Sequence, residues 1–347
     1  RLAEGTVDEC RVRLDSQQVS VKSVLLNRGG YSYLTGPAVP GKEKQEAAPA
    51  PGGSTPSLPW TVRIGSVVLT GNRAEYGLLN HRPAAGFDPS FIALSTLDLA
   101  VDSIYNRGAD IALRIRRMAF TERSGLTVSD MTGDIGMDAS GISLAGVTLK
   151  TPFSRIEANI SAGEGILALA PDSPLKAALT ADVNTKDLKY LYPALIPPVL
   201  DGRIVSLALT AAGTLGDIGK AGLDISSPGH VAFTADGAAR NVLDPGRMEA
   251  SARFEGDFRD MAFLEALLPD SALRRRIAIP DRIRLRGTAG ADKGAFSAAS
   301  TLSADGGEIA LQGRLDTRSE AYGIELRCDS FPLNSFLPAD SLGLIDL

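Results

Sequence analysis

Residues 141–161 read GISLAGVTLKTPFSRIEANIS. From residue 155 onward polar and apolar residues alternate strictly, with Ile156, Ala158 and Ile160 on the apolar phase. The same alternation precedes this run, with a one-residue slip at Ala145-Gly146 and with Ile142, Leu144, Val147 and Leu149 on the apolar phase. Period-two alternation is typical of a strand that has one face in water and the other against apolar material. The stretch predicts two strands, and it leaves open whether their apolar face meets another layer of the protein or a bound molecule.

The composition narrows the class of protein. The chain has 347 residues, 44% of them hydrophobic but only 5% aromatic, so aliphatic side chains supply most of the apolar surface. The formal net charge of −5 argues against a nucleic-acid partner, which requires a basic footprint. We expect the two cysteines, Cys10 and Cys328, to be small buried residues without a disulfide, since both lie on apolar phases of alternating runs.

The order of segments predicts four parts. Residues 1–34 form an N-terminal strand segment, and residues 35–59, rich in Pro, Ala and Gly, form a flexible loop. Residues 60–180 and 181–347 are dominated by short alternating runs separated by turn residues. Single-residue slips inside these runs indicate β-bulges, which bend and coil a sheet. We expect the chain, which opens at Arg1, to be an internal piece of a longer protein.

The second half contains a repeat of roughly 70 residues. Short helices are predicted at 187–192, 257–268 and 331–337, each followed by a proline: Pro193, Pro269 and Pro338. Similar phrases follow the first two prolines, LDGRIVSLALTAAG at 200–213 and IPDRIRLRGTAG at 279–290. Self-similarity at a fixed period favours a stack of units that contact mainly their neighbours.

The sequence does not predict an enzyme, a metal site or a cofactor. His81 and His230 are each read as exposed loop residues, because neither has a second ligand at a suitable spacing. The run GTLGDIGKAG at 213–222 fails the phosphate-loop pattern and is read as a turn between strands.

Two long stretches carry a resemblance to a known family. FIALSTLDLAVDSIYNRGADIALRIRRMAFTERSGLTVSDMTGDIGMDASGISLAGVTLKTPFSRIEANI (91–160) and LPDSALRRRIAIPDRIRLRGTAG (268–290), with the closing FLPADSLGLIDL, resemble the TamB branch of the AsmA-like superfamily. The resemblance implies a periplasmic protein anchored to the inner membrane and a β-taco fold with an apolar groove. It also implies a role in outer-membrane biogenesis, either phospholipid transport between the two membranes or help with outer-membrane protein assembly. A BamA-type barrel and the inner membrane are the implied partners, through parts of the parent protein that this chain lacks.

These observations lead to one favoured hypothesis and one alternative. The fold expected is mostly β: an elongated, curved, repeat-like sheet forming an open groove, with a few short helices. In the favoured hypothesis the groove holds phospholipid acyl chains, and burying a 16-carbon tail gains on the order of 12 kcal/mol. The residues expected to line it are Ile142, Leu144, Val147, Leu149, Ile156, Ile160, Val205, Leu207, Leu209, Ile283, Leu285, Ile309, Leu311, Ile324 and Leu326. Arg282, Arg284 and Arg286 are the candidates for contact with anionic headgroups.

The alternative is a self-packed β-solenoid or β-sandwich that serves as a scaffold or a surface adhesin. In that case the same apolar phases would form a closed core. A closed core leaves no extended apolar trench, so the two readings differ in the exposure of these side chains.

Overall fold

A computed structural model describes residues 4–36, 60–79, 81–163, 170–193, 196, 198–261, 278–304, 306–332 and 344–345. The protein is mostly β, and the expected fold class, an open and curved sheet with few helices, is confirmed. Residues 37–59 of the predicted loop lie outside the described residues. The chain divides into two compact units: unit 1 comprises residues 1–159 and 186–196, and unit 2 comprises residues 160–185 and 197–347.

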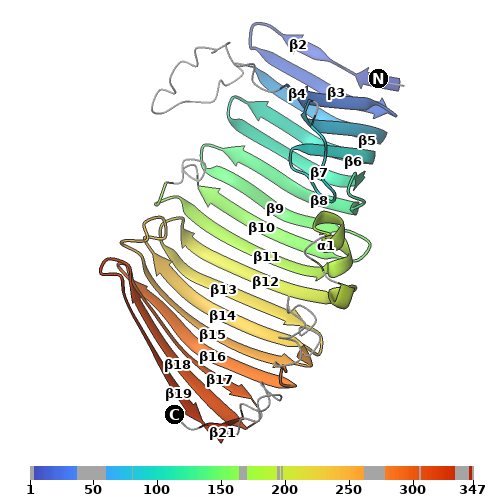
Figure 1. Ribbon diagram of the computed structural model, residues 1–347. Coiled ribbons are helices and arrows are strands. Elements are labelled where there is room, and N and C mark those ends of the chain that lie inside the picture. Colours follow the sequence, from blue (N-terminus) through green and yellow to red (C-terminus); the bar gives the residue numbers. More distant parts are fainter. Residues whose placement is uncertain are drawn as a thin grey trace. The chain divides into compact units, whose positions relative to one another are not determined.

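Unit 1 is a mixed sheet (Figure 1). Its strands are β1 (Glu4–Asp8), β2 (Arg11–Arg13), β3 (Gln18–Asn27), β4 (Gly30–Thr35), β5 (Thr61–Leu78), β6 (Phe91–Arg107), β7 (Asp110–Glu122), β8 (Thr127–Asp138) and β9 (Gly141–Lys150), with the first residues of β10 (Arg155–Gly163). From β5 to β9 each strand pairs antiparallel with the next. β3 and β4 instead lie parallel to β5, one beside its first half and one beside its second half.

The break between β3 and β4 is closed by a buried amide. Asn72 of β5 is fully buried, and its Oδ1 accepts a hydrogen bond from the Gly29 backbone N–H at 2.8 Å. Its Nδ2 donates to the Leu26 carbonyl at 3.0 Å. The side chain therefore satisfies the backbone groups that the break leaves without a ladder partner.

The predicted bulges are present in unit 1. Thr96 and Ser103 adopt positive φ in β6, where the apolar phase of that strand shifts. Gly146 has φ +57 at the slip in β9, and its N–H donates to the Asn159 side chain at 2.8 Å. Each bulge returns the apolar side chains of a long strand to one face, because the side-chain period is two.

Unit 2 is an antiparallel meander (Figure 1). Its main strands are β11 (Pro174–Asn184), β12 (Ile204–Thr214), β13 (Ile218–Ser227), β14 (Val231–Arg240), β15 (Glu249–Arg259), β16 (Arg282–Asp292), β17 (Ala295–Ala304), β18 (Gly307–Asp316) and β19 (Ala321–Asp329). β20 (Phe331–Pro332) and β21 (Leu344–Ile345) form a separate two-stranded ladder. The segment 213–222, read as a turn, contains the turn that joins β12 to β13 at residues 215–217, and its other residues belong to the two strands.

Two groups of four strands within unit 2 begin in the same way. β12–β15 and β16–β19 each follow a connecting segment whose two ends are joined by one backbone hydrogen bond. Thr185 N donates to Arg203 O at 2.9 Å before β12, and Asp260 N donates to Asp281 O at 2.8 Å before β16. The two phrases recognised in the sequence are thus the opening strands of these groups.

One of the three predicted helices is confirmed. α1 (Thr185–Leu191) covers most of the segment expected to be helical at 187–192. The helix predicted from residue 257 is wrong at its start, because Asp257 to Arg259 complete β15. Phe331 likewise lies in a strand rather than a helix. The remaining residues of these two segments, including Pro269 and Pro338, lie outside the described residues.

Little of this fold is buried. Among the described residues ten hydrophobic side chains are buried, and four of them are alanines. The chain exposes 21958 Å², whereas a compact protein of 36.3 kDa exposes about 13,400 Å². On the apolar phases of unit 2, Leu209, Leu311 and Leu326 are each at least 39% exposed, so these side chains do not meet in a closed interior.

Candidate functional site: the apolar face of the sheet

The strands of unit 2 share one continuous apolar face. In an antiparallel ladder, residues directly opposite each other point to the same side of the sheet. One row that crosses the strands in register from β11 to β19 consists of Ala181, Leu207, Ile225, Phe233, Gly256, Leu285, Leu302, Ile309 and Cys328. Phe233 stacks on Phe254 of the neighbouring row, with ring centroids 6.5 Å apart.

The structure brings together the residues that the sequence singled out on β12 to β19. Leu207, Leu285 and Ile309 belong to the row just described. The remaining members lie on the same face in adjacent rows: Val205, Leu209, Ile283, Leu311, Ile324 and Leu326. Nine of the fifteen predicted lining residues are therefore neighbours on a single surface.

Beside the bulky rows runs a row of very small side chains. At the matched position of eight successive strands stand Ala177, Ala211, Ala221, Gly237, Ala252, Ala289, Ala298 and Gly313. Seven interstrand steps of about 4.8 Å give this row a length of roughly 34 Å. The sequence alone did not reveal it, because each alanine gains its meaning only from the register of its neighbours.

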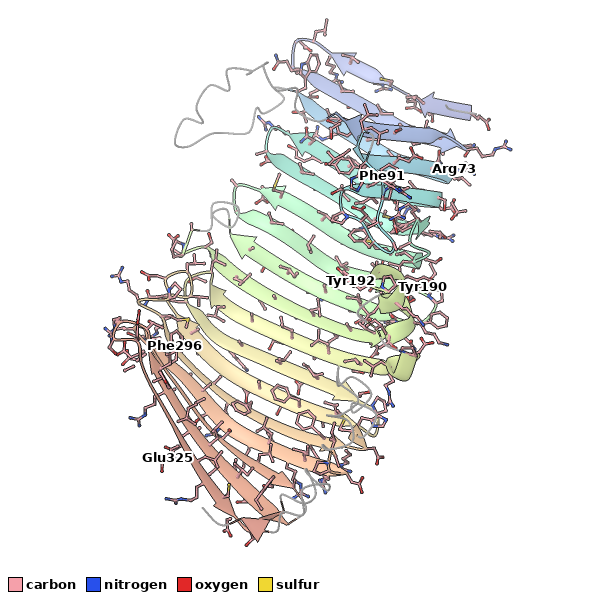
Figure 2. All side chains as sticks on the ribbon, viewed as in Figure 1. Arg73, Phe91, Tyr190, Tyr192, Phe296 and Glu325 are labelled. Carbon is pink, nitrogen blue, oxygen red and sulfur yellow. The ribbon has the colours of Figure 1, made fainter. Side chains whose placement is uncertain are left out.

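The middle of the small row, from Ala211 to Ala289, forms the floor of a hollow. A space of about 570 Å³ opens above it, and its lining includes Leu209, Leu223, Ile218, Met248 and Phe296. Figure 2 labels Phe296. Few of the lining residues are polar. Leu209 on this lining is 39% exposed, and Leu311 elsewhere on the same face is also 39% exposed, so the face meets solvent rather than a second layer of described residues.

The three arginines lie on the opposite, polar face. In β16, Arg282, Arg284 and Arg286 alternate with Ile283 and Leu285, which belong to the apolar face. A headgroup contact at these arginines would therefore lie across the sheet from the hollow.

The arginines differ in how they are paired. Arg282 binds the Asp257 carboxylate through two hydrogen bonds of 2.8 and 2.6 Å, and Arg259 adds two more of 2.6 and 3.2 Å. Arg282 first and Arg259 second hold the pKa of the Asp257 carboxyl well below its usual range. Arg286 lies 3.9 Å from Glu308, whereas Arg284 makes no ion pair with the described residues.

Unit 1 has an apolar face of its own. On β9, Ile142, Leu144 and Leu149 stand opposite Met137, Ile135 and Met131 of β8, and Val147 packs against Gly133. Ile156 of β10 is half-buried, as is Ile160 in the part of β10 that belongs to unit 2. Leu97, Val101 and Ile115 are buried on this face, so unit 1 covers its apolar phase more fully than unit 2 does.

Helix α1 closes one end of the strands in unit 1. The Asp187 carboxylate accepts hydrogen bonds from Thr151 Oγ1 and Ser154 Oγ, each at 2.5 Å, in the turn between β9 and β10. The Leu191 carbonyl accepts from the Phe87 N–H at 3.0 Å. Tyr190 and Tyr192 are exposed beside this contact (Figure 2).

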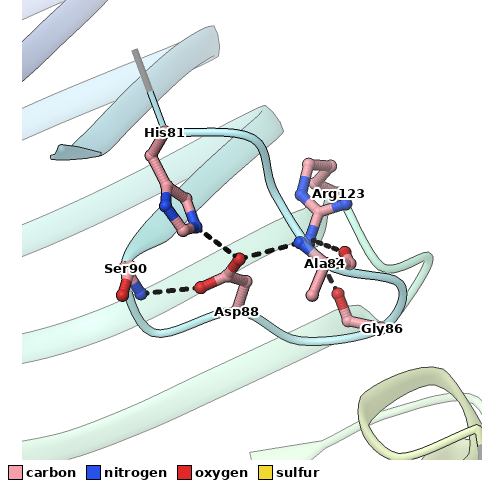
Figure 3. A network of polar contacts seen from close by, with 6 residues as sticks. All are labelled: His81, Ala84, Gly86, Asp88, Ser90 and Arg123. Atoms are coloured by element: carbon pink, nitrogen blue, oxygen red, sulfur yellow. Dashed lines mark hydrogen bonds and ion pairs between the residues drawn. The ribbon is translucent and has the colours of Figure 1, made fainter. Parts of the chain in front are cut away.

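A polar network orders the loop from residue 81 to residue 90 (Figure 3). The Asp88 carboxylate accepts from the backbone N–H groups of Ala84 and Ser90, both at 2.9 Å, and lies 2.8 Å from His81 Nε2. These contacts, that of Ala84 first, lower the pKa of Asp88 to about 2. Arg123, the residue after β7, donates to the carbonyls of Ala84 and Gly86 at 2.9 and 2.8 Å, which ties the loop to the end of β7.

This network corrects the expectation that His81 is an exposed loop residue. His81 is not a free loop residue but is partly buried against a carboxylate seven positions away. Its distance to Asp88 depends on how the loop folds back, which no spacing rule reveals. His230 is half-buried, with Nδ1 3.3 Å from the Arg259 carbonyl.

The remaining candidates for chemistry are few. Within the described ranges no group of three or more His, Cys, Asp or Glu could hold a metal ion. Cys10 and Cys328 are free thiols, and Cys10 is exposed rather than buried because β1 and β2 form an edge of the sheet of unit 1. None of the described helices is long and apolar enough to cross a membrane.

No protein-family model, curated protein or solved structure matches this chain. The apolar face of unit 2 is therefore the feature from which a function can be argued.

Proposed function

We propose that the apolar face of unit 2 is a trough for the hydrocarbon chains of phospholipids, in a TamB-like protein of the bacterial envelope. The proposal rests on one observation: an uninterrupted apolar face crosses nine strands and remains half-exposed. Monomeric proteins rarely leave a contiguous apolar surface larger than a few hundred Å² without a partner for it.

The dimensions of the face suit an acyl chain. One leaflet of the hydrocarbon core of a bilayer is about 15 Å thick, so the small-residue row of roughly 34 Å has room for two tails end to end. Alanine and glycine form the floor, which leaves space for a chain between the taller rows. Each CH₂ removed from water gains about 0.8 kcal/mol, and an open trough realises part of that gain for every carbon it covers.

The uniformity of the lining favours transport over tight storage. Because successive strands present similar aliphatic side chains, the free energy of a bound tail changes little as the tail slides along the row. A tail that leaves the trough for water loses all of the free energy gained by its burial. Such movement needs no catalytic residue, and it agrees with the role in lipid transport or outer-membrane biogenesis implied by the family resemblance.

The self-packed solenoid or sandwich is the weaker candidate. It requires the apolar phases to meet each other, whereas Leu209 and Leu311 are each 39% exposed. The row of alanines and glycines across eight strands, by contrast, leaves open space for a bound chain.

A pair of neighbouring residues provides a direct test. Leu209 and Thr210 are adjacent in β12 but point to opposite faces, and both are exposed. A photo-crosslinking amino acid at position 209 should capture phospholipid in cells or in vesicles, and the same amino acid at position 210 should not. Capture at both positions, or at neither, would contradict the proposal.

A second pair tests the floor of the trough. Ala211→Asp places a carboxylate in the small row beside Leu209, whereas Ala212→Asp places one on the polar face of the same strand. Lipid capture at position 209 should fall at least tenfold in the first variant only, because a charge in an apolar site costs several kcal/mol.

A further inference from the structure

Four segments of unit 1 meet at the end of the strands that helix α1 closes. Together they form the α1 margin, which consists of the loop 81–90, the segments 122–126 and 151–154 at two strand connections, and residues 185–192. Asp187 joins the helix to the second connection, and Arg123 joins the first connection to the loop. The ring of Tyr190 lies so close to Gly125 that an added Cβ atom would be 3.0 Å from it. The margin is therefore one continuous surface.

Three aromatic side chains of this margin face solvent. Phe153, Tyr190 and Tyr192 are each at least 42% exposed (Figure 2 labels the two tyrosines). Only 5% of the chain is aromatic, so three such side chains on one margin are a concentration. A tyrosine has an apolar ring and a polar hydroxyl group, and it is enriched where hydrocarbon meets water. The aromatic cluster therefore suits a boundary between an apolar and an aqueous phase.

The exposed charges of the α1 margin are all positive. Within its four segments the exposed ionised residues are Arg82, Arg123, Lys186 and Lys189. The acidic residues of the same segments, Asp88, Glu122 and Asp187, are all buried. Their carboxylates accept hydrogen bonds from the margin itself, as the Glu122 carboxylate does from the Ser124 N–H at 2.6 Å. The fold thus buries the negative charges of this surface and leaves its cations beside the exposed aromatic rings.

From this combination we infer that the α1 margin docks on the surface of a bilayer that contains anionic phospholipid. The lysines and arginines meet the lipid phosphates, and the aromatic rings enter the headgroup region. An acidic protein surface would satisfy the cations alone. The exposed aromatic rings favour a bilayer, where charged and apolar surroundings lie within the length of one side chain. The inference concerns unit 1 and does not depend on what the trough in unit 2 binds.

Flotation of the whole chain with lipid vesicles tests the docking. Phosphatidylglycerol vesicles should bind the chain about tenfold or more tightly than phosphatidylcholine vesicles at low salt, because only the former are anionic. Added salt should reduce the difference, since it screens exposed charges. Equal binding to the two kinds of vesicle, or no binding to either, would overturn the inference. So would binding of soluble polyglutamate as tight as that of the anionic vesicles, because the margin would then fit an acidic polypeptide.

Substitutions on the margin locate the contact. Arg82→Glu combined with Lys189→Glu should weaken binding to phosphatidylglycerol vesicles about thirtyfold or more, because two attractive charges become repulsive. Tyr192→Ser should weaken it about threefold or more through the loss of apolar contact area. Tyr192→Phe, which keeps the ring, should bind within about twofold of the unaltered chain.

Arg117→Glu serves as the matched control for charge. Arg117 is exposed in the middle of β7, outside the α1 margin, and its reversal should change vesicle binding by less than about threefold. A loss at position 117 as large as that of the double variant, or unchanged binding of the margin variants, would contradict the inference. Lipid capture at position 209 is scored separately in detergent-dispersed lipid, where no bilayer is present. Failure of one proposal therefore leaves the other standing.

Discussion

At the scale of single residues, the side chain of Asp88 shows how a carboxylate can order a loop. It accepts two backbone N–H groups and approaches His81, and its pKa is lowered to about 2. A carboxyl whose pKa is lower in the folded than in the unfolded chain stabilises the fold above its unfolded value, near 4. That contribution is lost as the pH falls through about 4 to about 2.

Asp88→Asn should therefore lower the melting temperature of unit 1 at pH 7, and the difference from the unaltered chain should shrink below pH 4. The amide cannot accept the two N–H groups and pair with His81 as the carboxylate does. Thermal unfolding followed by circular dichroism between pH 7 and pH 2 measures the difference. Asp224→Asn, an exposed position on β13, is the control. A difference that stays constant down to pH 2 would contradict this account.

At the scale of elements, alternation predicted strands well and helix ends poorly. The slip at Ala145-Gly146 predicted a bulge, because the apolar phase changes at a glycine. Gly146 has the left-handed backbone conformation that the bulge requires. The segment from Asp257 was expected to be helical, yet β15 continues to Arg259. The polar residues Asp257 and Arg259 lie on either side of the apolar Phe258, as in the preceding part of the strand. Helical spacing downstream could not reveal where the strand stops. The small-residue row was equally hidden, because it depends on eight registers at once.

Helix α1 offers a test at this scale. Asp187→Ala removes the carboxylate that receives Thr151 and Ser154, so the helix should lose its hold on the turn between β9 and β10. Amide hydrogen exchange at residues 186–191 should quicken about tenfold or more, since lost hydrogen bonds to a carboxylate weaken the contact by at least about 1.5 kcal/mol. Ser154→Ala, which removes one of the two bonds, should give a smaller effect. Unchanged exchange in Asp187→Ala would show that α1 is held by other contacts.

At the scale of the whole molecule, exposed surface is the quantity that separates this protein from a compact one. Its 21958 Å² exceed the roughly 13,400 Å² expected of a compact chain of this mass by more than half. The composition did not predict this large exposed surface, because a chain with 44% hydrophobic residues has enough of them to fill a closed core. The exposed apolar phases of the described strands, with Leu209 and Leu311 as examples, contribute to this surface.

The heat-capacity change of unfolding should reflect that surface. The unfolded chain exposes about 52,600 Å², so unfolding uncovers about four fifths of what a compact protein of this size uncovers. Scanning calorimetry, summed over all transitions, should give about 10–12 cal/mol/K per residue instead of the usual 12–15. A value at the upper end of the usual range would mean that the apolar face is covered in solution. Added phospholipid, by covering it, should move the value upward.

The paired hydrogen bonds at Thr185 and Asp260 have one more consequence. Each hydrogen bond precedes a group of four antiparallel strands. Because four is an even number, the chain leaves each group at the same end of the strands at which it entered. Such a group can be duplicated or deleted without turning the following strands over. A change in the number of groups would therefore give sheets of different length. The apolar side chains of every added strand would lie on the same face as those of the existing strands.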